Sequence, residues 1–225
     1  MALDKIHLRK VLQYLAMEPK KRASAIRADA REVVRKERAP RQEGGGDFHS
    51  CFWADAKAFA SGDLDLRDQT NLRIEASWQR KRLYPMLQEG FLHWWNEKRR
   101  WINEEITALP ETVGAPHDFI DLGGRIKVEN VLALKVGEDG LRLIYPYFSE
   151  APPLNPEVAR LGLWLMQQAL DHYDIKDMRI LDVLRSESYK IQDYPFTGKE
   201  GLVFVERYAT MVADWRALLA EFRAS

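Results

Sequence analysis

The sequence predicts an α/β (α+β) domain with a mixed, mainly antiparallel central sheet flanked by helices, together with a helical N-terminal extension. Three observations lead to this fold class. Apolar residues recur at helical spacing through most of the first 105 residues, alternation with a period of two begins after Pro110, and a further helix and strand follow Pro156. With 225 residues, of which 46% are hydrophobic, the chain can bury a substantial core.

The first 46 residues are expected to form two helices and a linker. The first helix, over residues 3–17, ends before Pro19, and the second covers residues 21–39. Their apolar faces consist of Leu8, Val11, Leu12 and Leu15 in the first helix and Ile26, Ala30, Val33 and Val34 in the second. Residues 40–47 contain three consecutive glycines and are expected to be a hinge. We therefore divide the chain into a basic extension, residues 1–46, and a core domain, residues 47–225.

Helices are also expected to lead into the core domain. A short helix within residues 48–62 ends at Gly62, and a longer helical stretch covers residues 68–105. Pro85 is expected to interrupt that stretch, because proline removes a helical hydrogen bond and clashes with the preceding turn.

A β-meander is expected after Pro110. Residues 125–136 alternate with a period of two, which predicts one face made of Ile126, Val128, Asn130, Leu132, Leu134 and Val136. The turn GEDG at 137–140 leads to a second strand over residues 140–150, and residues 118–122 are expected to add another strand. A helix then starts at Pro156, a strand covers residues 178–187, and a long amphipathic helix ends the chain.

Composition narrows the classes of function. Lys plus Arg and Asp plus Glu number 34 each, but residues 1–46 carry a net charge of +6 and the remainder −6. This asymmetry indicates either an anionic partner or docking of the arm on its own body. One cysteine, Cys51, excludes an internal disulfide and is typical of a reducing compartment, and no apolar run is long enough to cross a membrane. We expect a cytoplasmic protein with no membrane association, no cofactor and no structural metal.

Common catalytic motifs are absent. The sequence has no GxxxxGK[ST], GxGxxG, GxSxG, HExxH or paired CxxC. His93 and Glu97 are four residues apart in a predicted helix, which favours a surface pair flanking buried Trp94 over a shared metal or proton. Asp118 and Asp121 could bind a hard cation, although aspartates before a turn commonly serve the turn itself.

The stretch LRLIYPYFSE, residues 141–150, ends in two tyrosines separated by Pro146. Leu141, Leu143, Tyr145 and Tyr147 are expected to share the inward face of this strand. The predicted order of strand, hairpin, strand, helix and strand resembles the PD-(D/E)XK nuclease superfamily, especially its RecB-like branch. The resemblance covers roughly residues 88–215 and rests mainly on element order. The segment from Gly90 to Glu97 also resembles a Gly, His and Glu pattern in that branch, with one residue fewer.

The resemblance implies a metal-dependent nuclease whose defining residues are substituted here. It places Glu129 or Asn130 near the first metal-binding acid, Tyr145 at the second acid and Tyr147 at the lysine. A neutral phenol is a poor ligand for Mg²⁺, so the usual site is not intact. The candidate residues for a rearranged site, which Asp121 could join, are Glu89, His93, Glu129, Tyr145, Tyr147 and Lys190.

These observations favour a catalytically degenerate nuclease-like domain that acts by binding, with nucleic acid as the expected partner. The phosphate-binding residues expected in the arm are Lys20, Lys21, Arg22, Arg27, Arg31, Arg35, Lys36 and Arg38. One alternative is a structural or oligomeric interaction module that forms a homo-oligomer through its N-terminal helices. The other is a metal-dependent hydrolase with a rearranged site.

Overall fold

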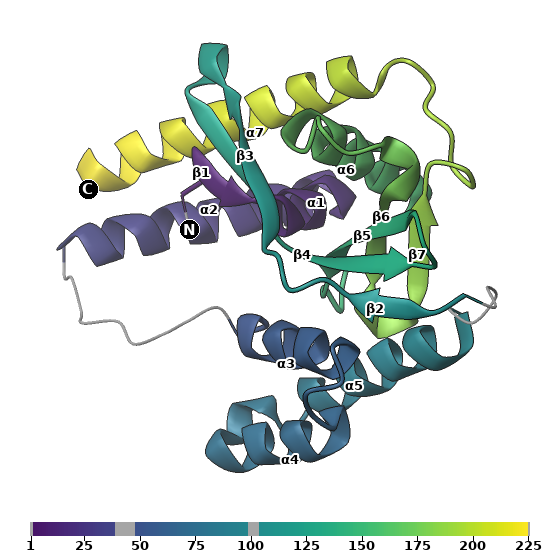
Figure 1. Ribbon diagram of the computed structural model, residues 1–225. Coiled ribbons are helices and arrows are strands. Elements are labelled where there is room, and N and C mark those ends of the chain that lie inside the picture. The colour runs from purple at the N-terminus through teal and green to yellow at the C-terminus, as the bar shows by residue number, and fades with distance from the viewer. Residues whose placement is uncertain (1, 39–47, 99–103, 225) are drawn as a thin grey trace.

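The computed structural model describes residues 2–38, 48–98 and 104–224. The hinge predicted at residues 40–47 therefore lies outside the described residues. In the described part of the chain, a mixed sheet of seven strands has helices on both faces, which confirms the predicted fold class (Figure 1).

The sheet is organised around one long strand, β4 (Gly124–Val136). Strand β5 (Gly140–Tyr147) pairs with β4 through the GEDG turn, and β6 (Met178–Asp182) runs parallel to β5. Strand β7 (Glu187–Lys190) completes that side. Strands β1 (Lys5–His7), β2 (Ile106–Ala108) and β3 (Val113–Phe119) all pair with β4, and only β1 is parallel to it. Most pairings are therefore antiparallel, as predicted.

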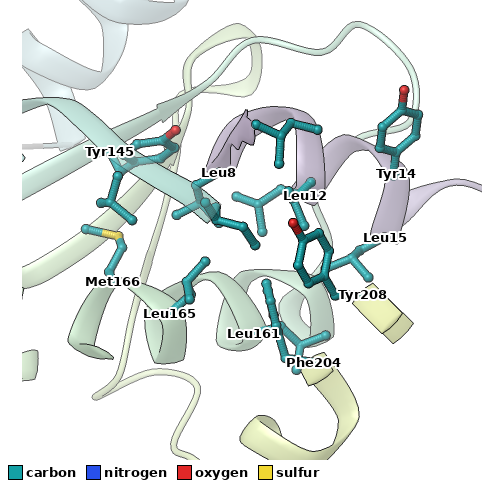
Figure 2. Close-up of a cluster of buried hydrophobic side chains, with 14 of the residues drawn as sticks. Leu8, Leu12, Tyr14, Leu15, Tyr145, Leu161, Leu165, Met166, Phe204 and Tyr208 are labelled. Carbon is teal, nitrogen blue, oxygen red and sulfur yellow. The ribbon is translucent and has the colours of Figure 1, made fainter. Parts of the chain in front are cut away.

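The main core lies on one face of the sheet. It is covered by α1 (Leu8–Ala16), α6 (Pro156–Ala169), α7 (Glu200–Ala224) and α2 (Pro19–Arg38). Figure 2 shows Leu8 and Leu12 of α1 beside Leu161 and Leu165 of α6, with Phe204 and Tyr208 of α7 closing the cluster. The predicted apolar face of α1 is buried in this core, and so are Ile26, Ala30 and Val34 of α2.

The opposite face carries a second core beneath α3 (Ser50–Ala60), α4 (Leu66–Ala76) and α5 (Leu83–His93). A 3-10 turn, Trp78–Arg80, precedes α5, and a π-helical turn, Trp94–Lys98, follows it. The predicted single helical stretch is thus several helices, and Pro85 lies in the first turn of α5 rather than within a long helix. A proline is tolerated there because its missing N–H would have no intrahelical partner.

The N-terminal segment is built into the sheet and the main core. Residues 5–7 form β1 and pair with residues 125–127 of β4, so the first helix begins at Leu8 and not near Leu3. The phenol of Tyr208 donates a hydrogen bond to the carbonyl oxygen of Leu3, which joins this segment to α7. The segment expected as an extension therefore supplies one strand and one wall of the core.

Strand β4 changes face at Asn130, contrary to the uninterrupted alternation predicted for it. Asn130 has a φ of 65°, in the left-handed region, and the register of β3 against β4 shifts between Val113 and Ala115. Ile126 and Val128 point into the main core before the switch, whereas Leu132 and Leu134 point into the second core after it. A left-handed residue breaks the pleat, so the two halves of the alternation fall out of phase.

Three short 3-10 turns lie next to strands. They are Ile120–Leu122 after β3, Ile175–Asp177 before β6 and Val183–Arg185 between β6 and β7. The strand predicted over residues 178–187 is therefore two strands, with Ser186 at a φ of 53° where the chain reverses.

Candidate functional site

A cleft opens where β4 turns away from β5. The pairing of these strands ends at Leu132 and Ile144, so the last residues of β5 have no partner on β4. The start of α1 borders the cleft on one side and α3 on the other, and two adjoining pockets share Arg9 and Phe148. The outer pocket has a volume of about 310 Å³, and the inner, more enclosed pocket has about 110 Å³.

Tyr145 and Tyr147 lie at the floor of this cleft, and the main core buries both. Their exposed fractions are 2% and 1%. The phenol oxygen of Tyr145 accepts a hydrogen bond of 2.9 Å from the backbone N–H of Arg9, and Tyr147 donates one of 2.8 Å to the carbonyl oxygen of Pro152. Burial raises the pKa of Tyr147 to about 12. Both hydroxyls thus serve the packing of α1 and of the loop after β5.

Glu129 lines the inner pocket beside the face switch in β4. Its carboxylate lies 3.4 Å from Nζ of Lys127 and 3.8 Å from Nδ1 of His7. The indole N–H of Trp53 in α3 donates a 2.6 Å hydrogen bond to the carbonyl oxygen of Asn130. This bond holds α3 against the switch and fixes the wall of the inner pocket.

The outer pocket contains a carboxylate that is already paired. Asp29 of α2 lies 3.6 Å from Nζ of Lys10 and accepts a short hydrogen bond from the phenol of Tyr14. Burial and this bond raise the pKa of Tyr14 well above its ordinary value. At the rim, the ring of His49 stacks on Phe148 at 4.9 Å with an interplanar angle of 3°.

Lys57 of α3 projects into the inner pocket and is half-buried. Burial lowers the pKa of its ammonium. Within the described ranges, no carboxylate forms an ion pair with this group. Among the described residues that line the two pockets, three are cationic, Arg9, Lys10 and Lys57, and two are carboxylates, Asp29 and Glu129.

The remaining candidates for a rearranged site are not brought together. Glu89 and His93 are exposed on α5, and Lys190 lies on β7 with its ammonium 3.5 Å from Asp193. Asp118 forms a bidentate pair with Arg125, and in the described part of the chain neither a hydrogen bond nor an ion pair joins His93 to Glu97. In the part of the chain that the structure describes, no group of three His, Cys, Asp or Glu residues could hold a metal ion.

Much of the basic arm is docked on the C-terminal helix. Arg27 pairs with Glu221 at 2.5 Å, and Arg223 of α7 pairs with Glu37 at 2.6 Å. The other contacts of the arm are those of Arg38 with the carbonyl oxygen of Phe222, of Arg31 with the Phe222 ring, and of Arg35 and Lys36 with Glu32. Lys20 and Lys21 are exposed and Arg22 is half-buried at the start of α2. Arg27, Arg31 and Arg38 of the arm thus contact α7 of the body. Docking of the arm on its own body was one of the two explanations predicted for the charge asymmetry.

Several residues of the cleft were not predicted from sequence. His7, Arg9, Lys10 and Lys57 come from β1, α1 and α3, and no motif connects them. Asp182 was missed as well: it is fully buried next to Tyr147 on β6 and pairs with Arg185 at 3.0 Å. A lone aspartate ending an apolar strand was the only available signal for it.

Comparison of the chain with protein-family models, with curated proteins and with solved structures finds no match in any of the three. None of the helices in the described ranges combines the length and the apolar character that crossing a membrane requires.

Proposed function

We propose that the protein is a nuclease-like domain without nuclease activity, which binds a nucleic-acid strand in the cleft between α1 and α3. The observation that carries this proposal is a cationic cleft located where the resemblance expects catalytic acids. Both Tyr145 and Tyr147 are hydrogen-bonded within the protein, and a phenol is a poor ligand for Mg²⁺.

The connectivity of the sheet supports the fold resemblance. Strands β3, β4 and β5 are antiparallel neighbours, α6 crosses over, and β6 lies parallel to β5. The order of elements is the one that the resemblance implies, although fold alone carries no function. The argument for binding therefore rests on the site.

Charge and shape support an extended polyanion as the ligand. Nucleic-acid binding depends mainly on lysines and arginines that neutralise phosphates. Each described carboxylate of the cleft is already beside a lysine, Asp29 beside Lys10 and Glu129 beside Lys127, whereas no described carboxylate pairs with Lys57. The half-buried ring of His49 lines the outer pocket and stacks on the buried ring of Phe148, and single-stranded bases stack on aromatic rings.

Fluorescence anisotropy with labelled single-stranded DNA, single-stranded RNA and duplex DNA tests the proposal. We expect binding whose affinity falls steeply between about 50 and about 200 mM salt. Lys10→Gln and Lys57→Gln should each weaken binding and reduce the salt slope by about 1. Lys176→Gln is the matched control, because Lys176 is exposed and pairs with Asp174 away from the cleft. Absence of binding at low salt would refute the proposal.

Two further arms of the experiment separate the alternatives. A double substitution of Lys20 and Lys21 by Gln tests the exposed start of α2; if it abolishes binding while the cleft variants do not, the arm and not the cleft is the binding surface. Incubation of each nucleic acid with Mg²⁺ or Mn²⁺ should leave it intact. Metal-dependent cleavage that Glu129→Gln abolishes would instead establish a hydrolase with a rearranged site.

A further inference from the structure

The inner pocket contains a charged group whose surroundings do not neutralise it. Lys57 lines the inner pocket together with Trp53 and Phe148, both of which are buried. Removing a charge from water is costly unless an opposite charge or hydrogen bonds compensate. Glu129 lines the same pocket, but its carboxylate is beside Lys127 and His7. An anionic ligand in the inner pocket would therefore compensate the charge of Lys57.

The enclosure of the inner pocket limits what part of a ligand can enter. At about 110 Å³ it holds one small group, whereas the outer pocket of about 310 Å³ has the volume of a small-ligand site. A strand that continued in both directions could pass the outer pocket but could not thread the inner one. The group that enters is thus the end of a strand.

The charge at this depth favours a phosphate monoester. A phosphomonoester carries about −1.5 to −2 charges at pH 7 and has three strong acceptor oxygens, whereas a linking phosphodiester carries one charge. Lys57 lines the inner pocket, and among the described residues no carboxylate forms an ion pair with it. His49, which lines the outer pocket and stacks on buried Phe148, is the ring expected to contact the adjacent base.

We propose that the inner pocket binds the terminal phosphate monoester of a nucleic-acid strand, with Lys57 as the residue that distinguishes a phosphorylated end from a hydroxyl end. The inference rests on the proposed function, since it assigns the end of the strand that the cleft binds. The same chemistry occurs at a 5′ or a 3′ end, and the experiment measures the two separately.

The test compares three single strands of one sequence, with a 5′-phosphate, a 3′-phosphate or two hydroxyl ends, by competition against a labelled strand. The full-length protein should bind one phosphorylated form about tenfold or more tightly than the hydroxyl form, as expected for hydrogen bonds to a charged group. In Lys57→Met, which keeps the apolar stem, the ratio of the two affinities should fall to about one. Lys57→Arg should retain part of the preference.

Ala54→Glu provides a second variant that does not alter a buried group. Ala54 is exposed on α3 at the edge of the inner pocket, so a carboxylate there should reduce the preference by repulsion while thermal melting stays unchanged. Inorganic phosphate at constant ionic strength should also lower the preference in the unmodified protein. Lys176→Met is the control and should keep the full ratio.

The experiment distinguishes failure of the terminal-phosphate inference from failure of the proposed nucleic-acid binding. If no strand binds, the proposed function fails. If all three strands bind equally well, nucleic-acid binding stands and the terminal-phosphate inference is refuted. A preference that survives in both Lys57→Met and Ala54→Glu would also refute it, because the phosphate would then bind elsewhere.

Discussion

The face switch at Asn130 can be tested by the order of stability of substitutions there. Asn130 is exposed and has a φ of 65°, so its backbone conformation matters more than its packing. A residue with a Cβ atom in the left-handed region costs about 1–2 kcal/mol, whereas glycine avoids this cost and asparagine tolerates it better than most. A β-branched residue is the least favourable. We therefore expect the order Asn130→Gly, then Asn130→Ala, then Asn130→Val, from most to least stable.

Lys135 is the matched control position. It is exposed on the same strand and is not among the residues with positive φ. In an ordinary strand valine is favoured over glycine by up to about 1 kcal/mol, so Lys135→Val should be more stable than Lys135→Gly. The order of glycine and valine should thus reverse between the two positions.

Urea denaturation and thermal melting measure both pairs. For a chain of this length 1 kcal/mol shifts the melting temperature by about 2–4 °C, so Asn130→Val should melt about 2–8 °C below Asn130→Gly. If valine is the better residue at both positions, residue 130 is in extended conformation. The strand would then alternate without interruption, and the wall of the inner pocket described above would be wrong.

Three further predictions concern buried positions. Gly90→Ala should destabilise by about 1–3 kcal/mol in urea denaturation although alanine favours helices, because the added Cβ would lie 2.0 Å from the carbonyl oxygen of Val183; stability equal to that of the unmodified protein would contradict this contact. Tyr147→Phe should cost about 1 kcal/mol by the same assay, since the carbonyl of Pro152 loses its donor, and a stabilised variant would show that the hydroxyl is not bonded there. Burial raises the pKa of Asp182 above its ordinary 3.8, so the folded carboxyl keeps its proton to higher pH than the unfolded one. The stability that this proton contributes is complete below pH 3.8 and is lost as the pH rises through the folded pKa of Asp182. The melting temperature of the unmodified protein should therefore fall relative to that of Asp182→Asn as the pH rises from 3.8 through that pKa. A difference in melting temperature that does not change with pH would exclude the pKa shift.

Local patterns determined most helices and the β-hairpin. The helical spacing of Leu8, Val11, Leu12 and Leu15 and the turn GEDG each depend on residues close in the chain. Pro156 and the capping Asn155, whose side chain accepts from the N–H of Val158, likewise define the start of α6 locally. Such signals are readable because helix periodicity and turn geometry involve only a few neighbouring residues.

The candidate site was predictable only in part. Glu129, Tyr145 and Tyr147 were singled out from sequence, and all three lie at the cleft. Arg9, Lys10 and Lys57 also line the cleft, but they are distant from these three residues in the chain and fit no motif. Their convergence depends on how β1, α1 and α3 close around the end of β5, and a sequence pattern contains no such distances.

The sequence by itself therefore determined the fold class and the apolar helix faces, and it singled out Tyr145 and Tyr147 at the end of their strand. The tertiary structure decided three other features: the change of face at Asn130, the docking of the arm on α7, and the cationic cleft. A single left-handed residue shifts the phase of a strand without altering its composition. Ion pairs such as that of Arg27 with Glu221 join residues that only the folded chain brings together.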